Sequence, residues 1–548
     1  MKKSALLLVA LGGAVWWPAL LGQPVYDDAI NFERNQALRE FDLPALVARP
    51  FFREHLNYWR PFSSGAAAIA WQGGFACVHL LALLLHAVSV GLLGSIARRL
   101  GAEPRVALLA SALFLVSPVL AESLGFASAL GDVLAGACLL GAVVVAMSSR
   151  PLGPVGVPVL LLAALLAKET AIAMVPVVLW VAIRSQVLSR AAWSCAGSAC
   201  ALLGWWAVRT YVVGVPLGPT GASASFEPGD RALGALEVLG RLVALPAWPW
   251  PATPFGALGS GAAAWHVGLL LVVAALVACA RGWAARLRWQ VAAALLFAPI
   301  ALPAALWPAL GEFPVQDRYL YVPAAGFALL VAPSLVRRWW VGLAVVVLFG
   351  AFAHRQIGIW RSPRAFVEHG LATAPQLATV QVMAGDLWLR EAREQGEAAL
   401  QQARTHYEAA LRSHFPAQPA LASERRAAAF AGLGWCVSSS SATVFPRDLE
   451  RVLGLFRQSL IEKETAVAHV GLGVALARSR RYAEAEASLR AALRLDERLP
   501  EAWFNLGVLH LEIGDRSAAR QSFAAALRCD PELEAAREHL RSLGGVGR

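Results

Sequence analysis

Apolar runs of near-membrane-spanning length recur through the first two thirds of this chain and exclude an ordinary soluble fold. A bilayer core requires about 20 consecutive apolar residues per helix. Only 16% of the residues are charged, whereas soluble domains carry about 25%. We therefore expect about eleven transmembrane helices, and a further interfacial or re-entrant helix at 232–250. The eleven runs are 4–21, 75–96, 105–120, 124–147, 155–167, 169–184, 191–209, 263–280, 289–310, 321–336 and 339–357.

Basic residues between the runs indicate the side on which each loop lies, because cytoplasmic loops are rich in Lys and Arg. With Lys2 and Lys3 in the cytoplasm, alternation places five short basic loops there too. These loops carry Arg98, Arg99, Arg105, Arg150, Arg184, Arg190, Arg281, Arg286, Arg288, Arg337 and Arg338. The net charge of +11 is thus explained by orientation signals, and no nucleic-acid partner is expected.

The same orientation puts the loop 22–74 and the chain after 357 outside the cytoplasm. The first run lacks a small-residue cleavage site, so an uncleaved anchor is expected. The bias toward Arg and Ala suggests a GC-rich bacterial genome. We therefore expect a multi-pass protein of the bacterial inner membrane, with a cytoplasmic N-terminus and a periplasmic C-terminal part.

A repeat of 34 residues occupies the C-terminal part. Trp503, Leu506, Gly507, His510, Ala519, Phe523, Ala526 and Pro531 match the pattern of large and small positions of the tetratricopeptide repeat. His469, Leu472, Gly473, Leu476, Ala485, Leu489 and Ala492 fill the same slots one repeat earlier. The clearest copies are 466–499 and 500–533, and two degenerate copies precede them with extra residues between their helices. We expect a linker helix at 358–374 and an α-solenoid of about four repeats at 375–548.

Such a solenoid offers a concave face to a peptide or protein. We expect Trp503, Asn505 and His510 to contribute to docking of a protein acceptor.

Ionisable residues at membrane depth are functional candidates, because burying a charge in lipid is costly. Asp27 and Asp28 lie just past the first run. With the orientation above, the other candidates lie on the same side of the membrane. They are Arg60, Glu122, Asp132, Lys168, Glu169, Arg209, Asp317, Arg318 and Tyr319. Taken singly, each is also explained as a helix-end anchor or a structural ion pair, and that alternative stays open.

Metal ligation has little support in the sequence. His79 and His86 lie on one face of the run 75–96, where packing or a hydrogen bond to a neighbouring helix is favoured over a metal. The seven cysteines include no CxxC pair, so structural zinc is not expected. No metal ligand is assigned, and a divalent cation between a carboxylate and a phosphate remains an open alternative.

The chain resembles the GT-C membrane glycosyltransferases. It is more closely similar to the transmembrane and tetratricopeptide-repeat O-mannosyltransferases and their bacterial relatives. The stretches that carry the resemblance are Tyr26-Asp27-Asp28, Tyr58-Trp59-Arg60-Pro61, His79-Leu80 with His86, Phe114 to Asp132, Lys168-Glu169-Thr170 and Asp317 to Pro323. The resemblance implies an all-α catalytic domain at 1–357, a polyprenyl-phosphate-linked sugar as donor, an aspartate of the first outer loop as base and a protein acceptor.

The charged residues of these stretches are compatible with this chemistry. Arg60, Lys168, Arg209 and Arg318 are candidates to neutralise the donor phosphate. Asp27 or Asp28 would take the proton of the acceptor hydroxyl as it attacks the anomeric carbon with inversion, and the sequence does not rank the two. Two alternatives stay open. One is a non-catalytic membrane scaffold for an envelope or secretion complex, and the other is the same enzyme acting on a cell-wall glycan or lipid.

Overall fold

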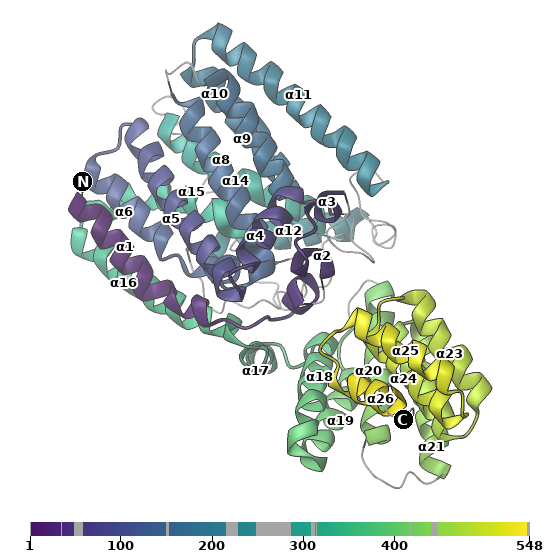
Figure 1. The fold of residues 1–548 in the computed structure, drawn as a ribbon. Helices are drawn as coiled ribbons and strands as arrows, with labels where there is room; N and C mark the ends of the chain where they lie inside the picture. The colour runs from purple at the N-terminus through teal and green to yellow at the C-terminus, as the bar shows by residue number, and fades with distance from the viewer. Residues whose placement is uncertain are drawn as a thin grey trace. The chain divides into compact units, whose positions relative to one another are not determined.

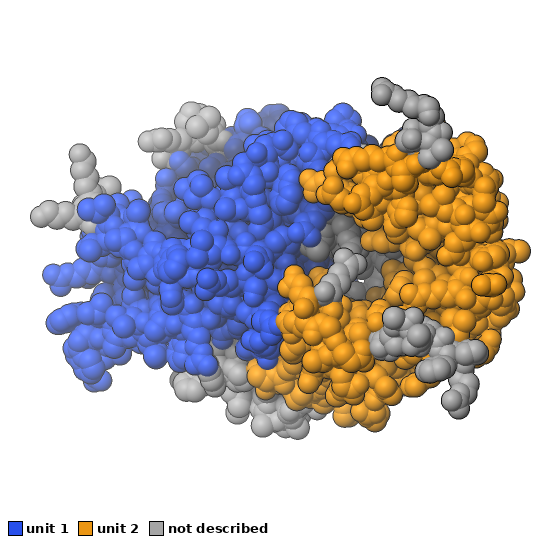
Figure 2. Space-filling view, turned by 60° about the horizontal axis from the view of Figure 1, so that its bottom comes forward, with its two compact units in different colours: residues 1–369 blue, residues 370–548 orange. Residues whose placement is uncertain are grey.

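The computed structural model describes residues 2–33, 35–48, 58–148, 153–214, 228–247, 287–307, 313, 315–415, 419–439 and 446–544. In these residues the chain is all-α, as predicted, apart from one isolated bridge between Leu377 and His414. It forms two compact units, residues 1–369 and 370–548 (Figure 2, blue and orange). The boundary falls inside the segment 358–374, where a linker helix was expected.

The first unit is a bundle of helices joined by short helical turns (Figure 1). Its α-helices are α1 (Lys2–Trp16), α2 (Gln36–Arg39), α3 (Leu43–Ala48), α4 (Pro61–Trp71), α5 (Phe75–Arg99), α6 (Pro104–Leu115), α7 (Ala121–Gly125), α8 (Leu130–Ala146), α9 (Gly153–Ala167), α10 (Val175–Ser185), α11 (Leu188–Val213), α12 (Pro228–Ala244), α14 (Leu287–Ala305), α15 (Tyr321–Val336), α16 (Trp339–Ile357) and α17 (Pro363–Thr373). The turns are η1 (Trp17–Leu21), η2 (Ala29–Glu33), η3 (Pro118–Leu120), η4 (Ala127–Ala129), η5 (Glu169–Met174), η8 (Asp317–Leu320) and η9 (Gly358–Arg361).

Six of the described helices are long and apolar enough to cross a membrane. They are Ser4–Leu21, Phe75–Arg99, Ala127–Ala146, Leu188–Val213, Asp317–Val336 and Trp339–Arg361. A seventh span results if the pair Pro104–Leu115 and Pro118–Gly125, bent by 47°, is counted as one. A total of eleven spans is therefore not shown.

The other predicted runs are shorter or broken in the structure. Pro154–Ala167 and Gln290–Ala305 are apolar but short. The run 169–184 forms the turn η5 followed by the 11-residue helix α10. The predicted run 263–280 lies outside the described residues. The helix expected at 232–250 is present as α12, although it begins at Pro228 and ends at Ala244.

The outward faces of several candidate spans are apolar, as contact with lipid requires. Large apolar side chains are exposed at helical spacing on α5 and α16, and also on α1. They are Leu80, Leu84 and Val88 on α5, Leu343, Val347 and Leu348 on α16, and Leu6, Leu7 and Val9 on α1. Such contiguous apolar surface is unusual for a soluble monomer, and it suggests a membrane environment for this unit.

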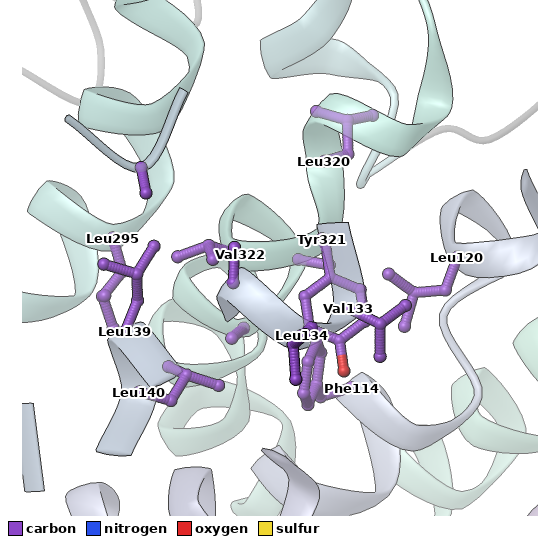
Figure 3. Close-up of a cluster of buried hydrophobic side chains, with 14 of the residues drawn as sticks. Phe114, Leu120, Val133, Leu134, Leu139, Leu140, Leu295, Leu320, Tyr321 and Val322 are labelled. Atoms are coloured by element: carbon purple, nitrogen blue, oxygen red, sulfur yellow. The ribbon is translucent and has the colours of Figure 1, made fainter. Parts of the chain in front are cut away.

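The interior of the first unit is closely packed around α8, which contacts both α5 and α9. Figure 3 shows side chains from several helices meeting there, with Tyr321 of α15 beside Phe114 of α6 and Val133 of α8. A Cβ atom on Gly136 would lie 2.3 Å from the Tyr321 ring. This residue therefore has to be glycine for α8 and α15 to approach each other. The packing holds the N-terminal end of α8, with Asp132, against neighbouring helix ends.

The second unit consists of paired antiparallel helices followed by one terminal helix (Figure 1). The helices are α18 (Ala378–Gln395), α19 (Glu397–Arg412), α20 (Pro419–Ser439), α21 (Pro446–Glu462), α22 (Ala466–Arg478), α23 (Tyr482–Leu495), α24 (Pro500–Glu512), α25 (Arg516–Cys529) and α26 (Glu534–Gly544).

The 34-residue period of the last two pairs is present in the structure. Ala466 and Pro500 start α22 and α24, and Tyr482 and Arg516 start α23 and α25. The two earlier pairs place their extra residues differently. In the first pair they lengthen α18, which α19 follows after one residue, and in the second pair they lie between Ser439 of α20 and Pro446 of α21, as expected. The helices α18 and α20 have 18 and 21 residues, against 13 in α22 and in α24.

Candidate functional site

Asp27 and Asp28 are adjacent in the chain but occupy different environments. Asp28 is fully buried. Its Oδ1 accepts hydrogen bonds from the Ser128 backbone N–H at 2.8 Å and from the Ser128 hydroxyl at 2.6 Å. Its Oδ2 accepts longer bonds, 3.4 Å each, from the N–H groups of Val25 and Ala127. Asp27 is only half-buried. Asp28 therefore fastens the loop that follows η1 to η4, whereas Asp27 is partly exposed.

No sequence motif marks Ser128, although it is the principal partner of Asp28. Its hydroxyl donates to Asp28 and accepts a hydrogen bond of 2.9 Å from the Nδ2 of Asn31. A single serine among small apolar residues carries no signal of this role. The contact joins residues one hundred positions apart, so only the fold reveals it.

Stability should depend on pH through Asp28. Burial raises the pKa of Asp28 from 3.8 to about 7, although hydrogen bonds from Ser128, Val25 and Ala127 lower it. The folded protein thus binds this proton more tightly than the unfolded chain. The resulting stabilisation is complete below pH 4 and is lost as the pH rises through 7. We expect the wild type to lose about 2 kcal/mol of stability between pH 5 and pH 8 from this group.

Thermal unfolding at pH 5 and pH 8, of wild type and of Asp28→Asn, measures this effect. The Asn side chain does not titrate, so the melting temperature of the variant should change less over the same interval. An equal change in both proteins would contradict the assignment of the titration to Asp28.

Three ion pairs gather the other charged candidates at helix ends. The Nε of Arg60 donates to the Oε2 of Glu169 at 2.9 Å, and the Trp59 backbone N–H donates to the Oε1 of the same carboxylate at 3.0 Å. Lys168, at the end of α9, is paired with Asp132 in the first turn of α8. Because Lys168 and Glu169 are adjacent, these two pairs belong to one cluster.

The third pair joins η8 to α7. Glu122 accepts a hydrogen bond of 3.2 Å from the Arg318 backbone N–H, and its Oε1 lies 3.6 Å from the Nε of Arg318. Glu122 is buried, and the Arg318 side chain is 23% exposed. The charge of Asp27 also attracts that of Arg318. Arg318 thus links Asp27 to the charged cluster.

A cavity lies beside these pairs. Asp132, Lys168, Arg318 and Tyr319 line it, together with apolar residues of α8, α14 and η5. The Lys168 ammonium lies 5.5 Å from the centre of the Tyr319 ring. The cavity offers about 40 Å³ to the centres of water molecules, which is room for a few waters. A phosphate group here would contact Lys168 and Arg318, which are paired in the structure with Asp132 and Glu122, and a sugar would require side chains to move.

Two further predicted residues lie near the cluster. Arg209 of α11 is buried, and the charge of Glu169 attracts it. Asp317 is buried beside Arg318, and the like charge of Glu122 acts on it. Every ionisable candidate of the first unit except Asp28, which binds Ser128, thus interacts electrostatically with at least one other candidate.

The two histidines of α5 form hydrogen bonds with neighbouring helices, as favoured from the sequence. The Nδ1 of His79 lies 3.3 Å from the Leu124 carbonyl oxygen. His86 contacts the Tyr321 hydroxyl at 3.1 Å and the Leu115 carbonyl oxygen at 3.3 Å. Among the described residues, no group of three His, Cys, Asp or Glu side chains is placed to hold a metal ion.

The three residues predicted to dock an acceptor are used largely within the second unit. His510 is buried, and its Nδ1 lies 3.2 Å from the Ser522 hydroxyl. The Nε1 of Trp503 donates to the Glu497 carbonyl oxygen at 2.9 Å. Asn505 donates to the Glu501 carbonyl oxygen at 2.7 Å and is half-buried. The burial of His510 leaves Trp503 and Asn505 as the two with surface for a partner.

The family comparison concerns the second unit. A family model of the tetratricopeptide repeat matches residues 464–534, which include α22 to α25. The chain therefore contains tetratricopeptide repeats, as the 34-residue period predicted. Repeats of this type are stacked helix pairs that form extended binding surfaces, which suggests protein–protein interaction. Among curated proteins, none matches the chain.

Similar solved structures are distant. One is a thermophilic TPR protein of Thermus thermophilus, with 20% identity, a TM-score of 0.27 and coverage of 36% of this chain and 94% of that chain. Another is the APC/C hetero-tetramer Cut9–Hcn1, with 12% identity, a TM-score of 0.24 and coverage of 94% of this chain and 96% of that chain. These scores are too low to support a functional inference.

Proposed function

We propose that this protein transfers a sugar from a polyprenyl-phosphate-linked donor to a hydroxyl group of a protein acceptor. The observation that carries the proposal is the cavity walled by Lys168 and Arg318, with the partly accessible Asp27 acting on Arg318. Cations at this position would hold the donor phosphate, and a carboxylate would serve as base. The reaction would take place on the extracytoplasmic face of a bacterial inner membrane.

Charge balance explains how the step would proceed without a covalent intermediate. The acceptor oxygen attacks the anomeric carbon while its proton passes to the Asp27 carboxylate. The bond from the anomeric carbon to the phosphate oxygen breaks, and its electron pair leaves with polyprenyl phosphate. Arg318 and Lys168 stabilise that phosphate charge. One displacement inverts the anomeric configuration.

Asp27 suits the role of base better than Asp28. A general base must approach the hydroxyl within hydrogen-bond distance. All oxygen contacts of Asp28 are directed inward, to Ser128 and to the N–H groups of Val25 and Ala127. We assign Asp28 a positioning role, which is to hold the turn that carries Asp27.

The second unit supplies a reason to favour a protein acceptor. Tetratricopeptide repeats would hold a polypeptide near the membrane unit and raise its effective concentration. Binding to the repeats would then determine which acceptor is used. The first unit would carry out the transfer.

A second candidate function is a non-catalytic scaffold. A purely structural charge network would also contain the observed ion pairs. These are Arg60 with Glu169, Lys168 with Asp132 and Arg318 with Glu122. The repeats would then assemble an envelope or secretion complex. A third candidate keeps the enzyme and replaces the protein by a cell-wall glycan or lipid.

Transfer from labelled donors separates these functions. The full chain in lipid nanodiscs is given radiolabelled polyprenyl-phosphate sugars and an extract of periplasmic proteins, and label is counted in protein, glycan and lipid fractions. We expect label in the protein fraction. Label confined to glycan or lipid would contradict the protein acceptor, and no transfer from any donor would favour the scaffold.

A further inference from the structure

A second cavity of the first unit also has Arg318 in its wall. Tyr26, Phe126, Phe313, Trp360 and Phe366 contribute five aromatic rings to its wall, together with Glu122, Gln316 and Arg318. Arg318 lines this cavity and also the cavity that contains Lys168. Arg318 is therefore common to the two cavities. The second cavity is lined mainly by aromatic residues, and the first is lined partly by charged residues.

The rings of the aromatic cavity are fixed by contacts with one another. Trp360 is stacked on Phe126 with ring centres 5.0 Å apart, and Phe366 lies 5.1 Å from Trp360. A Cβ atom on Gly125 would lie 2.9 Å from the Cβ of Trp360, so the absence of a side chain there allows this approach. Tyr26 completes the group, with its ring centre 5.9 Å from that of Phe366.

Tyr26 also has an unusual backbone. Its φ angle is +55°, a left-handed conformation that costs on the order of 1 kcal/mol or more for a bulky residue and that persists where the surroundings enforce it. Tyr26 is 38% exposed. Its ring contacts the rings of Phe126 and Phe366 in the cavity wall. Because Asp27 follows directly, the same strained turn positions both the cavity rim and the proposed base.

Two buried polar atoms of this cavity's lining residues, the Oε1 of Gln316 and the Nε of Arg318, have no hydrogen-bond partner among the described residues. The Oε1 of Gln316 is buried and accepts no hydrogen bond there. A buried acceptor of this kind costs about 1–3 kcal/mol if it stays unsatisfied. It is a suitable partner for an N–H or O–H group of a ligand. The charges of Glu122 and Arg318 offset each other, so a charged ligand is not required.

We infer that the aromatic cavity is the acceptor subsite, and that it takes an aromatic side chain next to the hydroxyl residue of a peptide. The inference rests on the proposed function, because it assigns the acceptor to the cavity that shares Arg318 with the cavity proposed for the donor phosphate. Aromatic pairs add affinity beyond the area they bury. The Oε1 of Gln316 would accept a hydrogen bond from a backbone N–H of the peptide. Since Asp27 directly follows Tyr26 of the cavity wall, the hydroxyl would lie near the proposed base.

The cavity is small before a ligand enters. It offers about 20 Å³ to the centres of water molecules, so an aromatic side chain has to displace the exposed ring of Tyr26. Side-chain rearrangement of this size is common on binding. It explains why binding should depend on the fixed ring of Trp360 more than on Tyr26.

Binding of two dipeptides tests the assignment without requiring transfer. Acetyl-Phe-Thr-amide and acetyl-Gly-Thr-amide are titrated against the full chain in nanodiscs, and saturation-transfer NMR measures each dissociation constant. We expect the Phe peptide to bind about tenfold more tightly, since one aromatic contact is worth about 1.4 kcal/mol. Trp360→Leu should reduce this preference to about twofold.

Two further variants serve as controls for the effect of Trp360→Leu. Trp340→Leu removes a tryptophan that is 61% exposed on α16 and should leave both affinities unchanged. Gln316→Leu should weaken both peptides by a similar factor of about three to ten, because it removes one hydrogen bond. A stable fold is checked for each by thermal unfolding.

The outcomes for the cavity and for the reaction are separate. Equal binding of both peptides, or a Phe preference that survives in Trp360→Leu, would overturn the subsite. A Phe preference that is lost in Trp360→Leu supports the subsite even where no donor releases its sugar. In that case the proposed transfer reaction alone would be overturned.

Discussion

Asp27→Asn is expected to lower sugar transfer by a factor of about 10²–10⁴, the usual contribution of a general base. The melting temperature should stay within a degree or two of wild type, because Asp27 is half-buried rather than enclosed. Asparagine keeps the shape of the side chain but cannot accept the proton of the hydroxyl. Transfer rates and thermal unfolding, measured on the same preparations, give both values.

Asp28 provides the matched comparison for Asp27. Asp28→Ala leaves the Ser128 N–H and hydroxyl without their buried acceptor, which costs about 1–3 kcal/mol. The melting temperature should fall, and transfer should fall with it. If Asp28→Asn abolished transfer in a stable protein while Asp27→Asn remained active, the roles of the two carboxylates would be reversed.

Lys168→Met is expected to be among the most destabilising single substitutions in the membrane unit. It leaves the Asp132 carboxylate buried without its cation, since the two side chains are 5% and 8% exposed. Breaking a buried ion pair costs about 3–5 kcal/mol. Transfer should be lost as well, because Lys168 lines the cavity proposed for the donor phosphate.

A double substitution separates the two losses. Asp132→Leu combined with Lys168→Met removes both charges, and stability should return to near the wild-type value, whereas transfer should not. Arg364→Met is the control, because its partner Glu368 is 62% exposed and a surface pair is worth at most about 1 kcal/mol. Recovery of transfer in the double variant would show that Lys168 has no role in donor binding.

Periodicity made the second unit largely predictable. The small residues that recur every 34 positions are those against which large rings pack: a Cβ on Gly507 would lie 2.7 Å from the Phe523 ring. The same pattern also included His510, one of the three residues predicted to dock an acceptor. His510 occupies a packing slot of the repeat and is buried for that reason. Residues that define a repeat are poor candidates for its binding face.

The membrane unit was predictable in outline, because hydropathy and loop charge depend on local sequence. The gathering of ionisable candidates followed from assigning them to one side of the membrane. Their pairing did not, since Arg318 and Glu122 are 196 residues apart. The helices are also interrupted at Pro118 and at η5. Hydropathy averaged along the sequence does not reveal such breaks, so the predicted helices were too long.

The aromatic cavity had no sequence signal. Tyr26, Phe126, Trp360 and Phe366 come from η-turns, loops and helix ends that are distant in the chain. Single aromatic residues at such positions are common, and only their mutual contacts distinguish them. The difference between Asp27 and Asp28 was equally hidden, because it depends on the backbone turn at Tyr26 and on Ser128.

The most direct test of the account is the release of polyprenyl phosphate from a polyprenyl-phosphate sugar. The full chain in nanodiscs is mixed with each donor, with and without periplasmic proteins, and the free lipid phosphate is measured by chromatography. We expect release with at least one donor, stimulated by the proteins and lost in Asp27→Asn. Donors that bind but never release polyprenyl phosphate would contradict the account and leave a membrane scaffold with buried ion pairs.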